Sequence, residues 1–205
     1  MAVPLRYSPF LFGVIYMDTL FITSPIPPSV NHYMGYRAIL RGGKPLSIPY
    51  KTTEANKYQK EFKEIIIDAV NTQGWDLPVN DKQHFYVDAT FYFPKKRMDC
   101  NNYWKVMLDT ITDTNLIWDD DDVVCERVQA IYYDTKDPRV ELVIHPVDYI
   151  GVFENESQLE EFESNCIGCT RYARNCSILR NAKDGRIQDE FEDGKCRKYK
   201  KKSND

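Results

Sequence analysis

The sequence has no excess of positive charge and no long apolar run. Its 205 residues include 27 Lys and Arg against 31 Asp and Glu, which gives a net charge of −4 at pH 7. This balance excludes a histone-like or ribosomal-type basic protein, whereas nucleic-acid binding needs only a local basic patch. No apolar stretch approaches the roughly 18–20 residues of a membrane-spanning helix, so we expect no membrane segment.

A clear secretory signal is also lacking. Residues 9–17 are apolar and resemble a weak signal-peptide core, but no small-residue cleavage site follows them. Residues 1–16 are alternatively an N-terminal extension, with Met17 as the true start. We expect a cytoplasmic protein with reduced cysteines, so that their spacing indicates metal binding or chance rather than disulfides.

Cysteine is scarce except near the C-terminus, where four of the six cysteines lie in the last 40 residues. From residue 153 onward the chain has 11 acidic and 11 basic residues and few apolar ones. So few apolar residues do not build a stable core without an additional link such as a bound metal. The sequence therefore predicts two domains, at 17–148 and 149–205.

The C-terminal cysteines have a spacing that suits a metal. Two, six and nineteen residues separate Cys166, Cys169, Cys176 and Cys196. Four thiolates fit a tetrahedral structural Zn²⁺, and zinc binding would then supply folding free energy to this appendage. The spacing also leaves open an iron–sulfur cluster, which we favour less, and the plain alternative is an unstructured tail.

Hydrophobic periodicity predicts the elements of the first domain. They are strands at 18–25, 84–93, 123–133 and 139–145, and helices at 53–72 and 102–114. The turn at 134–138 predicts that the last two strands form an antiparallel hairpin, and residues 37–48 predict a hairpin or a flexible basic loop. The fold class is α/β in the α+β sense, a small mixed β-sheet packed by helices.

Two acidic sites flank the second helix. Asp99 follows a strand, and a run of four aspartates occupies 119–122. The helix between them carries Lys105 and Asp109 on one face, at positions i and i+4. Carboxylates from the two segments can converge on Mg²⁺, beside a lysine that stabilises charge on a phosphate. Helix capping by Asp99 and a solvated turn at 119–122 are the plain alternatives.

These residues resemble the RusA-type Holliday junction resolvases over roughly 17–147. The matching segments are PIPPSVNHY (25–33), RMDCNNYWK (97–105), DTIT (109–112), LIWDDDDVV (116–124) and ELVI (141–144). The resemblance implies a homodimer that cuts four-way DNA junctions by paired nicks with Mg²⁺. It also implies a bacterial or phage-infected cell as the setting, with a role in recombination or repair.

The resemblance assigns roles to individual residues. It makes Asp99 and Asp120 metal ligands and Lys105 the catalytic lysine, while Asn31 and Tyr33 contact DNA or support the site. Asn101 stands where the family has a second acid. An amide oxygen binds Mg²⁺ more weakly than a carboxylate, so Asp119 or a neighbouring acid would compensate, or Mn²⁺ would replace Mg²⁺. The alternatives are a junction-binding protein with weak or lost cleavage, and an interaction protein organised by its zinc tail.

Basic residues near the proposed site would contact DNA phosphates. They are Lys95, Lys96 and Arg97 beside Asp99, and Arg37 and Arg41 in the early loop. Binding through such contacts is salt-dependent and reads shape more than sequence. The plain alternative is that these are solvated loop cations.

Overall fold

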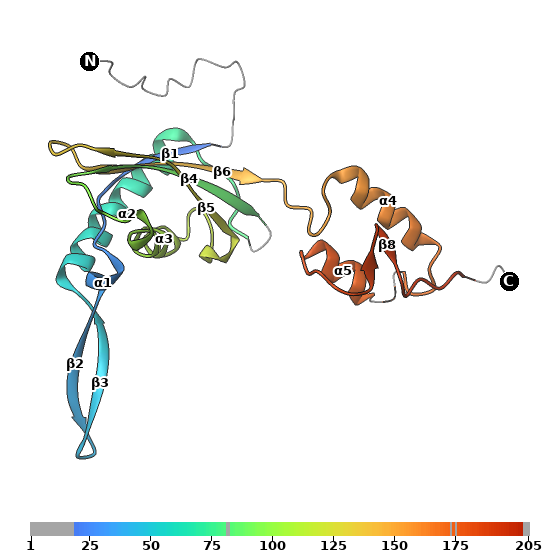
Figure 1. Cartoon of the computed structure of the whole chain (residues 1–205), viewed down its shortest axis with the longest axis horizontal. Coiled ribbons are helices and arrows are strands. Elements are labelled where there is room, and N and C mark those ends of the chain that lie inside the picture. The colour runs from blue at the N-terminus through green and yellow to red at the C-terminus, as the bar shows by residue number, and fades with distance from the viewer. Residues whose placement is uncertain (1–18, 81–82, 173, 175, 203–205) are drawn as a thin grey trace. The chain divides into compact units, whose positions relative to one another are not determined.

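A computed structural model describes residues 19–80, 83–172, 174 and 176–202 (Figure 1). The predicted extension at 1–16 and the proposed start at Met17 lie outside these residues. The chain divides into two compact units, the first ending at Val147 and the second beginning at Asp148. Within the described ranges, no helix combines the length and the apolar character that crossing a membrane requires.

A mixed four-stranded sheet forms the centre of the first unit. Its strands are β1 (Leu20–Pro25), β4 (His84–Phe93), β5 (Val124–Tyr133) and β6 (Arg139–Val147), in the order β1-β6-β4-β5. Strand β6 is antiparallel to both β1 and β4, whereas β4 and β5 are parallel. Alternate side chains of β4 are buried from Phe85 to Phe93, which is the pattern of a strand with one covered face.

The predicted hairpin between the last two strands is wrong, because β4 lies between them. The chain leaves β5 and crosses the end of β4, where the Asp134 N–H donates to the Phe93 carbonyl at 2.8 Å. Strand β4 therefore has a hydrogen-bonded partner on each side, β6 on one and β5 on the other. A short turn thus joins strands that run antiparallel without being neighbours.

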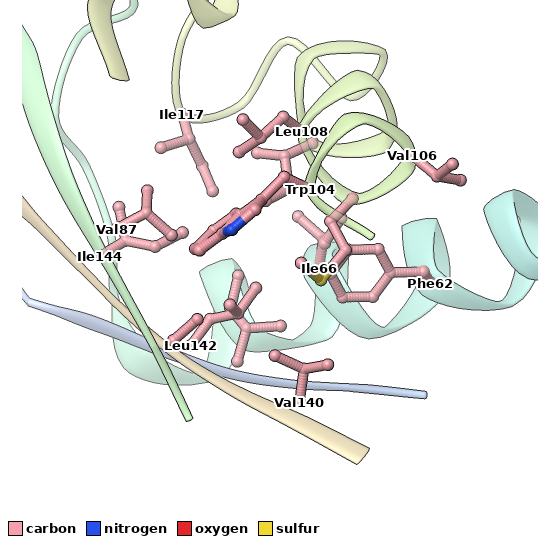
Figure 2. Packing of buried hydrophobic residues seen from close by; sticks show 14 of the residues in the cluster. Phe62, Ile66, Val87, Trp104, Val106, Leu108, Ile117, Val140, Leu142 and Ile144 are labelled. Carbon is pink, nitrogen blue, oxygen red and sulfur yellow. The ribbon is translucent and has the colours of Figure 1, made fainter. Parts of the chain in front are cut away.

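Two helices cover one face of this sheet, α2 (Thr53–Gln73) and α3 (Trp104–Thr112). The Thr52 side chain accepts the Ala55 N–H at 3.2 Å, and Gly74 ends α2 in a left-handed conformation at φ 68°. Figure 2 shows Phe62, Trp104 and Ile144 meeting in the core between the helices and the sheet. Both helices agree with the sequence prediction, although α3 is preceded by a short 3₁₀ turn, η1 (Cys100–Asn102).

A two-stranded arm leaves this unit. After the short helix α1 (Val30–Tyr33), strands β2 (Met34–Arg41) and β3 (Lys44–Lys51) pair along their full length. Gly42 and Gly43 both have positive φ, 59° and 75°, which suits a two-residue turn that matches the twist of the strands. Most side chains of the arm are exposed, and Figure 1 shows it extending away from α2. The structure therefore has the hairpin rather than the flexible loop.

The second unit has a much smaller core. It contains α4 (Glu156–Ile167), α5 (Ser177–Lys183) and two strands of two residues each, β7 (Phe191–Glu192) and β8 (Lys195–Cys196). Phe153, Phe162 and Ala182 are its buried cluster, with the rings of Phe162 and Phe191 4.9 Å apart. Neither helix was predicted from the sequence.

Candidate active site

Buried residues on both sides hold the acidic turn at 119–122. Trp118 is fully buried, and its indole N–H donates to Thr112 Oγ1 at the end of α3 at 2.8 Å. Val123, on the other side, is buried in the 3₁₀ turn η2 (Asp121–Val123) that leads into β5. Asp119 and Asp120 are exposed between these anchors, so the turn is fixed while its carboxylates remain accessible.

Lys105 is paired with Asp109, the acid of α3, and lies in the electrostatic field of the acidic turn. Its Nζ is 2.6 Å from Asp109 Oδ1, one helical turn further along α3. The hydrogen bond to Asp109 raises the pKa of Lys105, burial opposes this, and the charges of Asp109, Asp121 and Asp120 add to the increase. The structure thus pairs the predicted lysine with Asp109, and the charges of Asp121 and Asp120 act on it from the acidic turn.

Negative charge accumulates at this place. Burial raises the pKa of Asp121, and the like charges of Asp109 and Asp120 and a hydrogen bond to Asp120 raise it further, while Lys105 lowers it. Burial and the charge of Asp121 also raise the pKa of Glu126 on β5. We call Asp109, Asp120, Asp121 and Glu126 the acidic cluster. Like charges held close together in this way are stabilised by a cation.

Tyr33 joins the early loop to this cluster. It is buried on α1, and burial together with a hydrogen bond to Asp109 raises its pKa. The Thr52 N–H donates to the Tyr33 carbonyl at 3.1 Å, which ties α1 to the start of α2. Tyr33 therefore supports the carboxylate that holds Lys105, whereas Asn31 is exposed on the same helix.

Asp99 has a local role in the structure. It is exposed after β4, and its Oδ1 accepts the N–H of Asn101 at 3.0 Å, as the capping residue of η1. Asn101 is exposed as well. Among the described residues no hydrogen bond joins Asp99 to the acidic cluster, so a shared metal position for Asp99 and Asp120 remains a prediction.

Within the described ranges, no group of three or more His, Cys, Asp or Glu side chains is already arranged to hold a metal ion. The donor chemistry of the acidic cluster nevertheless fits a hard divalent cation, because carboxylate oxygens are its preferred protein ligands.

Sequence reasoning offered Asp121 only as an acid that could compensate for Asn101, and it did not assign Asp109 or Glu126 to the site. The i, i+4 spacing of Lys105 and Asp109 was visible, and their 2.6 Å ion pair makes Asp109 part of the cluster. Glu126 carried no such signal, because its position depends on how β5 follows the acidic turn.

The predicted DNA-binding cations are all accessible. Lys95, Lys96 and Arg97 are exposed in the loop that follows β4, where Arg97 has a left-handed backbone at φ 66°. Arg37 and Arg41 are exposed on β2 of the arm. These side chains are free to meet a polyanion.

The four C-terminal cysteines meet in the second unit. All of them line one cavity of about 20 Å³. Burial raises the pKa of Cys166 to about 11, and the charges of Cys196, Cys176 and Cys169 contribute to the increase. They are free thiols in the structure.

Carboxylates gathered around a lysine on an α+β domain, with exposed cations nearby, are typical of enzymes that cleave phosphodiester bonds. The family model for endodeoxyribonuclease RusA matches residues 25–145, from the end of β1 to β6. The chain belongs to the RusA family and is an endodeoxyribonuclease of the Holliday junction resolvase type, which binds branched DNA. A comparison with curated proteins found no match. The second unit lies outside the matched residues.

Proposed function

We propose that the first unit resolves four-way DNA junctions by hydrolysing phosphodiester bonds beside Lys105, with Mg²⁺ as cofactor. The observation that carries this proposal is the position of Lys105. Its ammonium group is 2.6 Å from Asp109 Oδ1, and the negative charges of Asp120 and Asp121 raise its pKa. The chain that carries this lysine belongs to the RusA family.

Carboxylates on both sides of α3 would hold the metal. The ligands we propose are Asp99, Asp119 and Asp120, with Asn101 contributing an amide oxygen. When bound, Mg²⁺ lowers the pKa of a water molecule and neutralises charge on the phosphate. Burial contributes most to the increased pKa of Asp121, and the charges of Asp109 and Asp120 add to it; a cation at this position would offset that repulsion. Mn²⁺ is the alternative ion, because Asn101 supplies no charge.

Lys105 would stabilise the negative charge that develops on the phosphate. Asp109 holds the ammonium group in one orientation on α3, and Tyr33 in turn holds Asp109 through a hydrogen bond. A donor that is oriented before the reaction needs no rearrangement in the transition state, which is where electrostatic catalysis gains most. We propose Asp109 and Tyr33 as positioning residues.

DNA contacts would come from two exposed basic segments. Lys95, Lys96 and Arg97 lie directly before Asp99 in the chain, and Arg37 and Arg41 lie on the arm together with Asn31 nearby in sequence. These contacts would be to phosphates, because a junction presents a shape rather than one base sequence. A twofold-symmetric homodimer would present two such sites to the junction and make paired nicks, as part of recombination or repair.

A second candidate is a junction-binding protein with weak or lost cleavage. The observation that favours it is at η1, where Asn101 is neutral and the Asp99 carboxylate accepts the Asn101 N–H. A site with fewer charged ligands binds Mg²⁺ less tightly.

A synthetic four-way junction tests both candidates. With Mg²⁺ or Mn²⁺ we expect symmetric paired nicks, and we expect Asp120→Asn to abolish cleavage while leaving junction binding largely intact. Asp68→Asn, an exposed acid on α2, is the control and should cleave as the wild type does. Tight junction binding without product at any metal concentration would favour the second candidate, and equal binding to junction and linear duplex would contradict both.

A further inference from the structure

The second unit places four cysteines from separate segments around one small cavity. Cys166 is in the last turn of α4, Cys169 follows it in a turn, Cys176 directly precedes α5 and Cys196 ends β8. Their common cavity is also lined by Phe162 of α4, by Ile178 and Leu179 of α5, and by Tyr172 and Tyr199. Twenty-nine residues separate Cys166 from Cys196, so their place at one cavity is a property of the fold and not of local spacing.

The backbone around Cys169 is arranged to receive a thiolate. The Cys169 N–H donates to the Cys166 carbonyl at 2.9 Å, which closes the turn between the two cysteines. The Lys200 N–H points at Cys169 Sγ at 3.5 Å. The Thr170 N–H donates to the Lys200 carbonyl, and the Lys202 N–H donates to the Gly168 carbonyl, at 2.8 and 2.9 Å. The C-terminal segment is thereby fastened across the cysteine turn.

Hydrophobic burial alone does not explain this order. Phe153, Phe162 and Ala182 are the buried cluster of the unit, and its β-sheet consists of two strands of two residues each. A pair of strands this short is marginal in water without a further constraint. Cys166 and Cys196 pack directly against the small core, so a link between them would stabilise it.

Charge around the cavity favours a metal bound by thiolates. Four thiolates and one divalent cation carry a net charge of about −2. Arg171 and Lys198 line the same cavity, and Lys195 lines an adjoining, more open one together with Cys166 and Cys196. The bases would balance the charge of the site, and the adjoining cavity gives an ion access to the sulfur atoms.

We propose that Cys166, Cys169, Cys176 and Cys196 bind one structural Zn²⁺. All four positions of a tetrahedral ion are then filled by the protein, which is the arrangement of structural rather than catalytic zinc. The cavity of about 20 Å³ has room for little more than one water-sized occupant, so a single ion fits it better than an iron–sulfur cluster. The thiols are not yet arranged around an ion in the structure, so binding requires their side chains to move until each sulfur lies about 2.3 Å from the Zn²⁺.

Metal content of the full chain tests this proposal. The protein is purified in reducing buffer without chelator, and zinc and iron are measured by elemental analysis. We expect about one zinc per chain and no iron. After exchange for Co²⁺, we expect the intense thiolate charge-transfer bands of a tetrahedral site with four sulfur ligands.

Matched variants locate the ion. Cys176→Ser and Cys196→Ser should each lose zinc and change the Co²⁺ spectrum, whereas Cys125→Ser, an exposed cysteine on β5 of the first unit, should retain both. Zinc released from the wild type by a thiol-modifying mercurial is a second measurement, which does not depend on folding of the variants. Absence of metal, iron in place of zinc, or full zinc content in both cysteine variants would overturn the proposal.

Discussion

The two units of this chain are organised by different physical means. In the first, a sheet and two helices bury aromatic and aliphatic side chains, and the charged residues of the acidic cluster lie at the edge of that core. In the second, few side chains are buried, and four thiols line a cavity beside them. A metal in the first unit would therefore serve chemistry, because hydrophobic packing already holds the fold. A metal in the second would serve folding.

Chelation should separate the two units most strongly. Structural zinc contributes about 10–16 kcal/mol in small cysteine-bound domains, far more than the small core of the second unit could replace. After zinc is removed with a strong chelator, amides around Phe162 and Ile178 should exchange with solvent at unfolded rates, while those of β4 and α2 stay protected. Hydrogen exchange with mass spectrometry measures both units at once. Equal protection of the second unit before and after chelation would show that its fold does not depend on a metal.

Substitution of Lys105 should affect chemistry without affecting either fold. Lys105→Gln removes the charge that would stabilise the phosphate, so we expect cleavage of a junction to fall by about 10²–10³-fold. Junction affinity and thermal unfolding should change little. The matched control is Lys57→Gln on α2, where the lysine is also exposed but distant in sequence from the acidic turn. Single-turnover cleavage measures the effect, and a wild-type rate would remove Lys105 from the site.

The hydrogen bond from Trp118 to Thr112 anchors the acidic turn, and its removal tests whether packing positions the site. Thr112→Val keeps the shape of the side chain but leaves the buried Trp118 indole N–H without its acceptor. We expect a loss of about 1–3 kcal/mol in unfolding free energy, with a decrease in cleavage as the turn loosens. Urea unfolding gives the first quantity. Thr53→Val, at an exposed position in the first turn of α2, should change neither quantity.

The smallest expected effect is a gain in stability. The folded protein raises the pKa of Asp121, so proton uptake stabilises the folded state and this contribution is lost as pH rises above the usual aspartate range. Asp121→Asn should therefore raise the free energy of unfolding at pH 7. We expect a gain of less than about 1 kcal/mol, because the site is partly solvated. The difference should disappear at low pH, where Asp121 is protonated. Calorimetry at several pH values measures it, and lower stability of the variant at pH 7 would contradict the charge repulsion inferred for the cluster.

Local patterns were sufficient to predict the elements that shape the first unit. Helix α2 follows from apolar residues at three- and four-residue spacing between Thr52 and Gly74, and β4 from strict alternation ended by a proline. The partners of β5 and β6 could not be predicted, because alternation shows which face of a strand is buried and not which strand lies beside it. The elements of the second unit escaped prediction because they are short and polar.

The candidate site was predictable only where its residues are close in sequence. Lys105 and the acids at 119–122 belong to two short motifs, so the sequence predicted that they lie close together. The contact between Tyr33 and Asp109 joins segments 76 positions apart, and only the packing of α1 beside α3 reveals it. The same holds for the four cysteines, whose spacing indicated a metal but whose meeting point depends on α4, α5 and β8 together.

The arm has a length that can be expressed in base pairs. Each of its strands contains eight residues, and a strand of that length spans about 26 Å at about 3.3 Å per residue. This distance equals the rise of roughly seven to eight base pairs at 3.4 Å each. An arm bound along a duplex would therefore protect about three quarters of a helical turn beyond the domain that carries it. Removing two residues from each strand would shorten that footprint by about two base pairs. The number of residues between Met34 and Lys51 would then determine how much duplex a DNA-bound arm covers.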